Sequence, residues 1–384
     1  MMGFDFATVK NIHFGRDSIR QIDDLLSAQF SGKKVFIVTD AGLMAAGIVP
    51  PVVAQLESQF QVKIYQDVQA DPSEQIIVDA LEQAKVFDAD IIIGFGGGSS
   101  MDTAKLIAVL LDNELSLPEI YGVEQIFTKR KVPLVLIPTT AGTGSEVTPI
   151  SIVTTGETTK MGVVSKQLYA DIAILDPILT LDLPPHITAA TGIDAMVHAI
   201  EAYTSQHKKN PLSDMCAKQA LHLLHAGIKA AVDDGHNIQA RENMLLGAML
   251  AGQAFANAPV AAIHALAYPI GGIFHVSHGL SNALVMLPVM RFNADSAAPL
   301  YAELAPIFNP NIVGHDGAMT QALIGSLDEL MQELGLERNL SQLGIGEKDL
   351  DRMADDAMLQ TRLLMNNPKE VKRDDAFKIY QSIL

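Results

Sequence analysis

Two segments in the second half of the chain carry side chains that could bind a metal ion. Asp194 and His198 stand four residues apart, and on a helix that spacing puts both side chains on one face, one turn apart. His264 and His278 follow in a second dense block, residues 260–292. One carboxylate and three imidazoles suit a divalent first-row metal such as iron or zinc. The alternative is that these are ordinary polar residues of helices, and the spacing of Asp194 and His198 alone does not decide between the two.

A glycine-rich segment upstream has the features of a nucleotide-binding loop. Residues 94–105 (GFGGGSSMDTAK) follow a predicted strand and open a predicted helix. Without side chains, Gly96, Gly97 and Gly98 let the backbone approach a pyrophosphate, and the helix N-terminus offers free N–H groups. Ser99 stands where the usual G-x-G-x-x-G pattern has its third glycine. A tight strand-to-helix turn that binds no ligand is the alternative.

Two further features support a ligand site in this half. The loop 138–146 (PTTAGTGSE) also follows a predicted strand directly, and the carboxyl ends of parallel strands are where doubly wound sheets bind ligands. Asp40 ends an earlier strand and is placed to accept a hydrogen bond from an adenosine ribose, which would favour NAD over NADP. The alternative for Asp40 is a plain helix N-cap ahead of Gly42.

The first half of the chain has the pattern of parallel βαβ units. Short β-branched runs predict strands, residues 147–183 predict further strands, and the segments between the runs have helical apolar spacing. The strands are expected at 34–39, 62–65, 90–94 and 133–137, and the helices at 42–60, 73–87 and 99–111.

From Leu183 onward only helical periodicity is found. Pro184-Pro185 ends any preceding secondary-structure element and can start a helix. We therefore predict a Rossmann-like dinucleotide-binding α/β domain, 1–183, and an all-helical metal-binding and catalytic domain, 184–384, with a cleft between them. The helices are expected at 186–205, 211–233, 238–257, 260–273, 279–292, 298–306, 315–335, 347–364 and 370–382.

Composition restricts the possible partners and compartment. The 384 residues are 48% hydrophobic and 18% charged, with a net charge of −17 and no Trp, which argues against nucleic acid and anionic membranes as partners. The one cysteine, Cys216, excludes intramolecular disulfides and is expected to be a helix residue without chemistry. We expect no signal peptide and no membrane span, and hence a cytoplasmic protein.

Taken together, these motifs resemble the iron-containing (group III) alcohol dehydrogenases, with lactaldehyde reductase and 1,3-propanediol dehydrogenase as the nearest types. The resemblance covers essentially the whole chain. It rests on Asp40, on GGGSSMDTAK at 96–105, PTTAGTGSEVT at 138–148, TGIDAMVHAIEAY at 191–203, IHALAYPIGG at 263–272, HGLSNALVMLP at 278–288, and on Asn367-Pro368.

The resemblance implies a dehydroquinate-synthase-like fold and hydride transfer between NAD(H) and a primary alcohol or aldehyde. It implies that catalysis runs through one metal, iron or sometimes zinc, held by Asp194, His198, His264 and His278. It assigns the cofactor to Gly96, Gly97, Gly98, Ser99 and Asp102, with Thr139, Thr140 and Ser145 around the diphosphate and nicotinamide, and Lys160 near the nicotinamide ribose.

The chain departs from the family pattern on the substrate side. Tyr268 stands where several members have a proton-relaying histidine, and a phenol is a poor proton shuttle at neutral pH. Ile150 and Leu363 stand where lactaldehyde reductase has an amide and a small thiol, and Phe255 is expected to add an aromatic wall. These residues predict a more apolar pocket, and His275 is a further candidate near the substrate.

Two alternatives have different consequences. A glycerol-dehydrogenase-like polyol oxidoreductase or a dehydroquinate-synthase-like enzyme should carry basic residues near its ligands or different ligand spacing, whereas no Lys or Arg adjoins a predicted ligand here. A non-enzymatic metal-binding scaffold would need no nucleotide loop. The expected partner is therefore a small alcohol or aldehyde, and the resemblance implies a homodimer or larger homo-oligomer.

Overall fold

The computed structural model describes residues 3–111, 113–156 and 159–384, and the chain divides into two compact units. One is Thr8–Asp182, and the other is Leu183–Leu384 together with the N-terminal segment that ends at Ala7. The first is built on a parallel sheet and the second on helices. The predicted fold class is confirmed.

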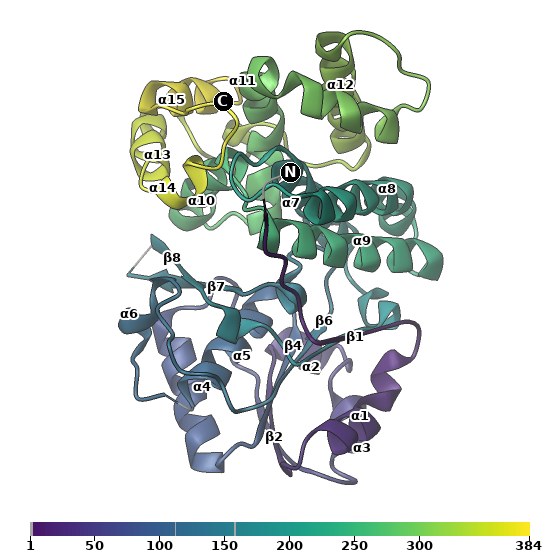
Figure 1. Ribbon diagram of the computed structural model, residues 1–384, viewed down its shortest axis with the longest axis vertical. Coiled ribbons are helices and arrows are strands. Elements are labelled where there is room, and N and C mark those ends of the chain that lie inside the picture. The colour runs from purple at the N-terminus through teal and green to yellow at the C-terminus, as the bar shows by residue number, and fades with distance from the viewer. Residues whose placement is uncertain (1–2, 112, 157–158) are drawn as a thin grey trace. The chain divides into compact units, whose positions relative to one another are not determined.

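A six-stranded parallel sheet forms the centre of the α/β unit. Alternate residues of its strands, such as Val35 and Ile93, pack under α1 (Ile22–Gln29) and α3 (Pro50–Leu56). Figure 1 shows α4 (Glu74–Phe87) and α5 (Gly98–Leu110) on the opposite side of the sheet. Both faces are covered, which explains why the four central strands are almost entirely apolar, whereas the two edge strands carry polar residues. The strand order is β1 (Asn11–Phe14), β9 (Ile172–Leu175), β6 (Leu134–Pro138), β4 (Ile91–Gly96), β2 (Lys34–Val38) and β3 (Gln61–Tyr65).

A second, three-stranded sheet encloses α5 from its other side. It consists of β5 (Gly122–Val123), β8 (Thr159–Val164) and β7 (Ile150–Thr155). Leu106 and Val109 of α5 pack against Val153 and Val163 of this sheet, with α6 (Leu117–Ile120) beside them. Because α5 lies between two sheets, its N-terminus is held in a defined position after β4.

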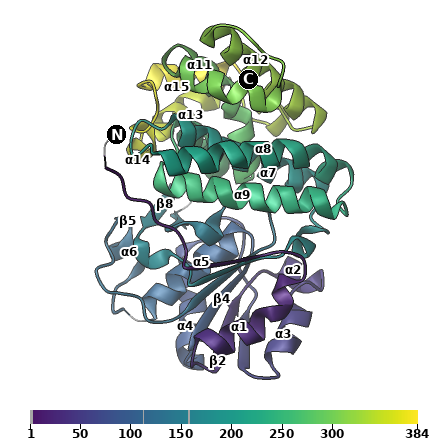
Figure 2. The ribbon, with the colours of Figure 1, turned by 45° about the vertical axis from the view of Figure 1, so that its right-hand side comes forward.

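The helical unit is organised around α7 (Pro185–Thr204), in which every residue from Gly192 to Thr204 is buried. This helix packs against α8, α9 and α11, and Figure 2 shows α7, α8 and α9 side by side. The other helices are α8 (Pro211–Asp233), α9 (Ile238–Asn257), α10 (Ala262–Phe274), α11 (His278–Phe308), α12 (Asp316–Glu333), α13 (Leu350–Ala357), α14 (Thr361–Leu364) and α15 (Arg373–Gln381).

Strands are absent from this unit's described residues from Leu183 on, as predicted. None of its helices combines the length and apolarity needed to cross a membrane alone. In the described part of the chain, α9 and α10 meet that test together, as a pair bent by 108°.

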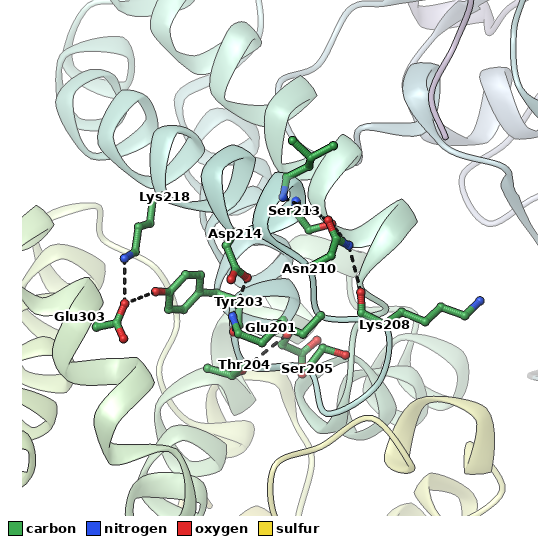
Figure 3. Close-up of polar contacts among 12 residues, drawn as sticks. Glu201, Tyr203, Thr204, Ser205, Lys208, Asn210, Ser213, Asp214, Lys218 and Glu303 are labelled. Carbon is green, nitrogen blue, oxygen red and sulfur yellow. Dashed lines mark hydrogen bonds and ion pairs between the residues drawn. The ribbon is translucent and has the colours of Figure 1, made fainter. Parts of the chain in front are cut away.

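The corner between α7 and α8 is tied by the polar contacts drawn in Figure 3. Asn210 caps α8 by accepting from two backbone N–H groups of the first turn. The hydroxyl of Tyr203 donates to Glu303 of α11, and the Lys218 ammonium donates to the same carboxylate at 2.9 Å. The contact of Tyr203 with Glu303 ties the last turn of α7 to α11, and Tyr203 lies two residues after Glu201.

Several predicted helix boundaries are wrong. The helix expected at 42–60 is two helices, α2 (Ala41–Ala45) and α3, because Gly47 adopts a φ of 75° and Pro50 starts a new helix. The helices expected at 279–292 and 298–306 are one helix, α11, with Pro288, Pro299 and Pro306 inside it. The helix expected at 347–364 is split into α13 and α14.

The N-terminus differs from the expected domain division. Residues 1–183 were expected in one domain, whereas the segment ending at Ala7 groups with the helical unit. The side chain of Asn257 explains this: its Oδ1 accepts from the Ala7 N–H at 2.7 Å and its Nδ2 donates to the Ala7 carbonyl at 2.8 Å. Strand β1 follows this segment and has no counterpart among the strands predicted from the sequence.

Candidate metal centre and nucleotide loop

The helical unit brings the four predicted metal donors together. Asp194 and His198 come from adjacent turns of α7, His264 from the first turn of α10, and His278 is the first residue of α11. One donor atom from each residue lies within 4.8 Å of the other three. Three of the residues are buried, and the side chain of His278 is 39% exposed. One oxygen and three nitrogens at this spacing fit a single divalent cation.

A close helix contact places His278 in the cluster. A Cβ on Gly279 would lie 2.5 Å from the carbonyl oxygen of Ala190 in α7. Only a glycine allows this approach, so the first turn of α11 can lie directly on α7. Packing against α7 therefore explains why a glycine, Gly279, follows His278.

The charges in the cluster favour an ionised carboxylate. Burial raises the pKa of Asp194, but the three neighbouring imidazoles and the Asn282 N–H outweigh it and hold the pKa below its ordinary value. Asn282 Nδ2 donates to Asp194 Oδ1 at 2.6 Å and lies 3.3 Å from His264 Nε2 and 3.2 Å from His278 Nε2. Asn282 Oδ1 is buried and has no hydrogen-bond partner in the described part of the chain.

Glu201 completes the polar surroundings of the cluster. It lies one turn beyond His198 on the same face of α7 and is only 3% exposed. Its Oε2 is 2.7 Å from His264 Nδ1, and its Oε1 accepts from the Ile263 N–H at 2.6 Å. One carboxylate thus contacts both the ring and the preceding peptide of a predicted ligand.

The predicted substrate residues divide into two groups. Phe255 stacks on His198 with ring centroids 4.3 Å apart, and the Tyr268 ring centroid is 6.2 Å from that of His278. Both therefore lie beside the metal donors. Leu363, on α14, is 1% exposed and belongs to the core of the helical unit, and His275 is an exposed residue that ends α10 with a φ of 57°.

The glycine loop of the α/β unit has the geometry of an anion cradle. Gly96 ends β4 with a φ of 154°, where a Cβ would meet the Ser100 hydroxyl at 2.8 Å. Gly97 is the N-cap of α5, and no side chain caps the first turn. The N–H groups of this turn are thus available to an anion. The Thr139 N–H donates to the Gly96 carbonyl at 3.0 Å, which joins the two predicted loops.

Two predicted cofactor residues bond to each other. The Ser145 hydroxyl donates to Asp102 Oδ1 at 2.6 Å and accepts from Lys105 Nζ at 2.7 Å. Asp102 Oδ2 accepts from the Ile152 N–H at 2.9 Å, and Lys105 Nζ also donates to the Ile150 carbonyl at 2.7 Å. These contacts of Asp102, Lys105 and Ser145, here called the brace, join α5 to the loop after β6 and to β7.

Buried charge accompanies this brace. Lys105 is fully buried, which lowers its pKa, while the Asp102 carboxylate opposes that shift. Burial also raises the pKa of Glu146 to about 7.

Asp40 and Lys160 already have protein partners. Asp40 Oδ1 accepts from the Leu43 N–H at 3.0 Å, so the N-cap interpretation is confirmed for this oxygen. Lys160 Nζ donates to Thr154 Oγ1 at 2.9 Å and pairs with Asp71 at 2.8 Å. Asp40 follows β2 at the carboxyl edge of the six-stranded sheet, whereas Lys160 lies on β8 of the three-stranded sheet.

Three residues in these sites were missed from the sequence. Glu201 is seven residues after Asp194, Asn282 is four after His278, and Lys105 is three after Asp102. All three intervals put a residue on the same helix face as a predicted site residue. Helical spacing extended by one or two turns was the signal that could have found them.

Two models of one family match almost the whole chain. The model described as iron-containing alcohol dehydrogenase matches residues 10–177, and the Fe-containing alcohol dehydrogenase family C-terminal model matches residues 188–384.

Individual relatives agree with these matches. Long-chain-alcohol dehydrogenase 1 of Geobacillus thermodenitrificans is 39% identical, covering 92% of this chain and 90% of its own. The NAD-dependent methanol dehydrogenase of Bacillus methanolicus is 32% identical, covering 96% and 97%. The crystal structure of a 1,3-propanediol oxidoreductase superposes with a TM-score of 0.95 at 33% identity and covers all of both chains.

A parallel α/β unit with a glycine cradle and a helical unit with a carboxylate–imidazole cluster define a metal-dependent dehydrogenase. The chain belongs to the iron-containing alcohol dehydrogenase family. The predicted enzyme class is confirmed, and the interpretation as a non-enzymatic scaffold is wrong.

Proposed function

We propose that this protein oxidises primary alcohols with NAD, or reduces the corresponding aldehydes with NADH, in a metal-dependent reaction. The observation that carries the proposal is the convergence of Asp194, His198, His264 and His278 within 4.8 Å in the helical unit. The α/β unit of the same chain carries the glycine cradle.

These four residues would hold one Fe(II) or Zn(II). A metal bound there supplies a Lewis acid that lowers the pKa of the alcohol and stabilises negative charge on its oxygen. Asp194 contributes the one formal negative charge among the four donors, so a divalent site keeps a net positive charge. Asn282 holds Asp194 by donating to Oδ1, which keeps the carboxylate from turning away from its neighbours.

The glycine loop would hold the cofactor diphosphate. The net charge of −17 opposes an anionic ligand, so binding depends on local donors at the start of α5 and on the hydroxyls of Ser99, Thr139 and Thr140. NAD held there would supply the acceptor for the hydride of the alcohol carbon. The NAD-dependent methanol dehydrogenase among the relatives supports this choice of cofactor.

The substrate is proposed to be a primary alcohol of intermediate length. Phe255 and Tyr268 place aromatic rings beside the metal donors. Each substrate methylene buried against such side chains adds about 0.8 kcal/mol, roughly fourfold in kcat/KM. A second hydroxyl would lose water without gaining a partner. The long-chain-alcohol dehydrogenase among the relatives supports a substrate with an alkyl chain.

A substrate panel tests the proposal. Protein loaded with Fe²⁺ or Zn²⁺ is mixed with NADH and straight-chain aldehydes, and with NAD and the matching alcohols, while NADH absorbance is followed. We expect turnover that requires the metal and a kcat/KM that rises from ethanol to butanol. Absence of NADH turnover with every substrate would reject the proposed activity. A preference for glycerol or 1,2-propanediol over butanol would reject only the apolar pocket and favour a polyol oxidoreductase.

We further propose a cytoplasmic homodimer or larger homo-oligomer. The single cysteine supports a compartment without disulfide formation. Light scattering of the purified protein tests the oligomeric state, and a mass of one chain would reject it.

A further inference from the structure

We propose that Glu201 is a positioning residue that determines which nitrogen of His264 faces the metal site and thereby sets the metal affinity. This inference rests on the metal site of the proposed function. It concerns a residue that binds neither metal nor substrate itself.

The first observation is that both oxygens of Glu201 contact the segment that carries His264. Oε2 lies 2.7 Å from His264 Nδ1, and Oε1 accepts from the Ile263 N–H at 2.6 Å. The residue before α10, Ala261, has no side chain able to cap that helix. Glu201 therefore holds the first turn of α10 and the imidazole in that turn together, from a position that is 3% exposed.

The second observation is the proton arrangement that these contacts require. A carboxylate oxygen accepts, so the proton of neutral His264 lies on Nδ1 and the lone pair on Nε2. Asn282 indicates the same arrangement independently. Its Nδ2 is identified as the donor by the 2.6 Å contact with Asp194 Oδ1, and it lies 3.3 Å from His264 Nε2. The Asn282 N–H therefore faces a lone pair on His264 Nε2. A histidine with its proton on Nδ1 and a lone pair on Nε2 can bind a metal through Nε2.

The third observation is the place of Glu201 on α7. Asp194, His198 and Glu201 follow one another at intervals of four and three residues, so they share one helix face. This helix thus supplies two proposed ligands and the partner of a third. Glu201 links α7 to the first turn of α10, which carries His264.

Glu201→Gln tests the inference with almost no change in shape. The amide oxygen can still accept from the Ile263 N–H, but the amide N–H₂ then faces His264 Nδ1. That contact favours a lone pair on Nδ1 and a proton on Nε2, which blocks coordination. We expect the affinity for Zn²⁺, measured by competition with a chromophoric chelator, to fall about 10- to 100-fold.

Glu303→Gln is the matched control. Glu303 is another glutamate of the helical unit, its side chain is 54% exposed, and it accepts from Tyr203 and Lys218 rather than from a proposed ligand. Its Zn²⁺ affinity should equal that of the wild type. Circular dichroism in excess chelator checks that both variants are folded.

A spectroscopic signature separates this role from a purely structural one. In chelator-treated wild type labelled with ¹⁵N-histidine, the His264 signals, assigned by their loss in His264→Ala, should show a protonated Nδ1. In Glu201→Gln they should show a protonated Nε2. If the variant does not fold, the wild-type spectrum alone decides, and a protonated Nε2 there overturns the inference.

The outcomes distinguish this inference from the proposed function. A wild type that binds no Zn²⁺ would reject the metal site itself. A wild type that binds Zn²⁺ while a folded Glu201→Gln binds it within twofold would reject only the role of Glu201.

Discussion

At the scale of single residues, the helix-cap role of Asp40 leaves its proposed cofactor role possible, although the sequence presented the two as alternatives. One carboxylate oxygen caps α2 through the Leu43 N–H. A carboxylate has a second oxygen, and capping leaves its charge in place. Asp40 can therefore cap the helix and still disfavour a cofactor with a ribose 2′-phosphate.

We expect NAD to be preferred over NADP, and Asp40→Asn to relax the preference. The amide oxygen keeps the cap, whereas Asp40→Gly would also lose about 1 kcal/mol of capping energy. Removal of a charge a few ångströms from a phosphate should change the NADP/NAD ratio of kcat/KM about tenfold or more. Equal wild-type kinetics with both cofactors would show that Asp40 does not face the ribose.

Glu146 should make stability depend on pH. Burial raises its pKa from 4.5 to about 7, so between these values the folded protein holds a proton that the unfolded chain has released. Stability therefore falls as pH rises through this window, by up to about 3 kcal/mol, and stays lower above it.

Urea unfolding of the wild type and Glu146→Gln at about pH 5 and about pH 8 measures this effect. Other titrating groups cancel in the comparison of the two proteins. The variant should gain up to about 3 kcal/mol relative to the wild type as the pH rises. Parallel pH profiles would contradict the assignment.

At the scale of elements, Lys105 joins α5 to the loop after β6 and to the start of β7. Its ammonium donates to Ser145 and to the Ile150 carbonyl and pairs with Asp102 at 3.3 Å. The brace fixes the first turn of α5 relative to the neighbouring loop. Cofactor binding and folding should therefore depend on the same buried group.

Lys105→Met should lower the free energy of unfolding by about 3 kcal/mol, because the Asp102 carboxylate, whose side chain is only 14% exposed, loses its cation. NADH affinity, measured by fluorescence titration, should fall as well. Lys85→Met is the control, since Lys85 is an exposed residue in the last turn of α4, and its effect should stay within about 0.5 kcal/mol. Unchanged NADH affinity in a folded Lys105→Met would show that the brace does not position the loop.

At the scale of the whole molecule, metal binding should stabilise the fold. A cation at 100 times its dissociation constant adds about 2.7 kcal/mol, so a chelator should lower the wild-type Tm. The half-exposed His278 is the best ligand to remove, since His264→Ala would also leave Glu201 without its imidazole. His278→Ala should abolish the effect of the chelator on Tm. If elemental analysis shows that His278→Ala keeps its full metal content, His278 is not a ligand.

The sequence by itself determined the two-unit architecture and indicated most of the proposed site residues, because both depend on local patterns. Apolar runs such as 34–38 predict buried strands wherever they lie in a sheet. Asp194 and His198 share a helix face by spacing alone. The glycines at 96–98 predict a close backbone approach before any partner is known.

Tertiary structure decided which polar groups pair and where helices continue. Ser145 meets Asp102 and Glu201 meets His264 across 43 and 63 residues of sequence, and no local pattern encodes such pairs. Helix α11 continues through three prolines because it is packed along much of its length, and this packing offsets the roughly 3 kcal/mol that an interior proline costs. Local periodicity indicates which face of an element is buried, whereas the partner of a buried group depends on how the elements pack.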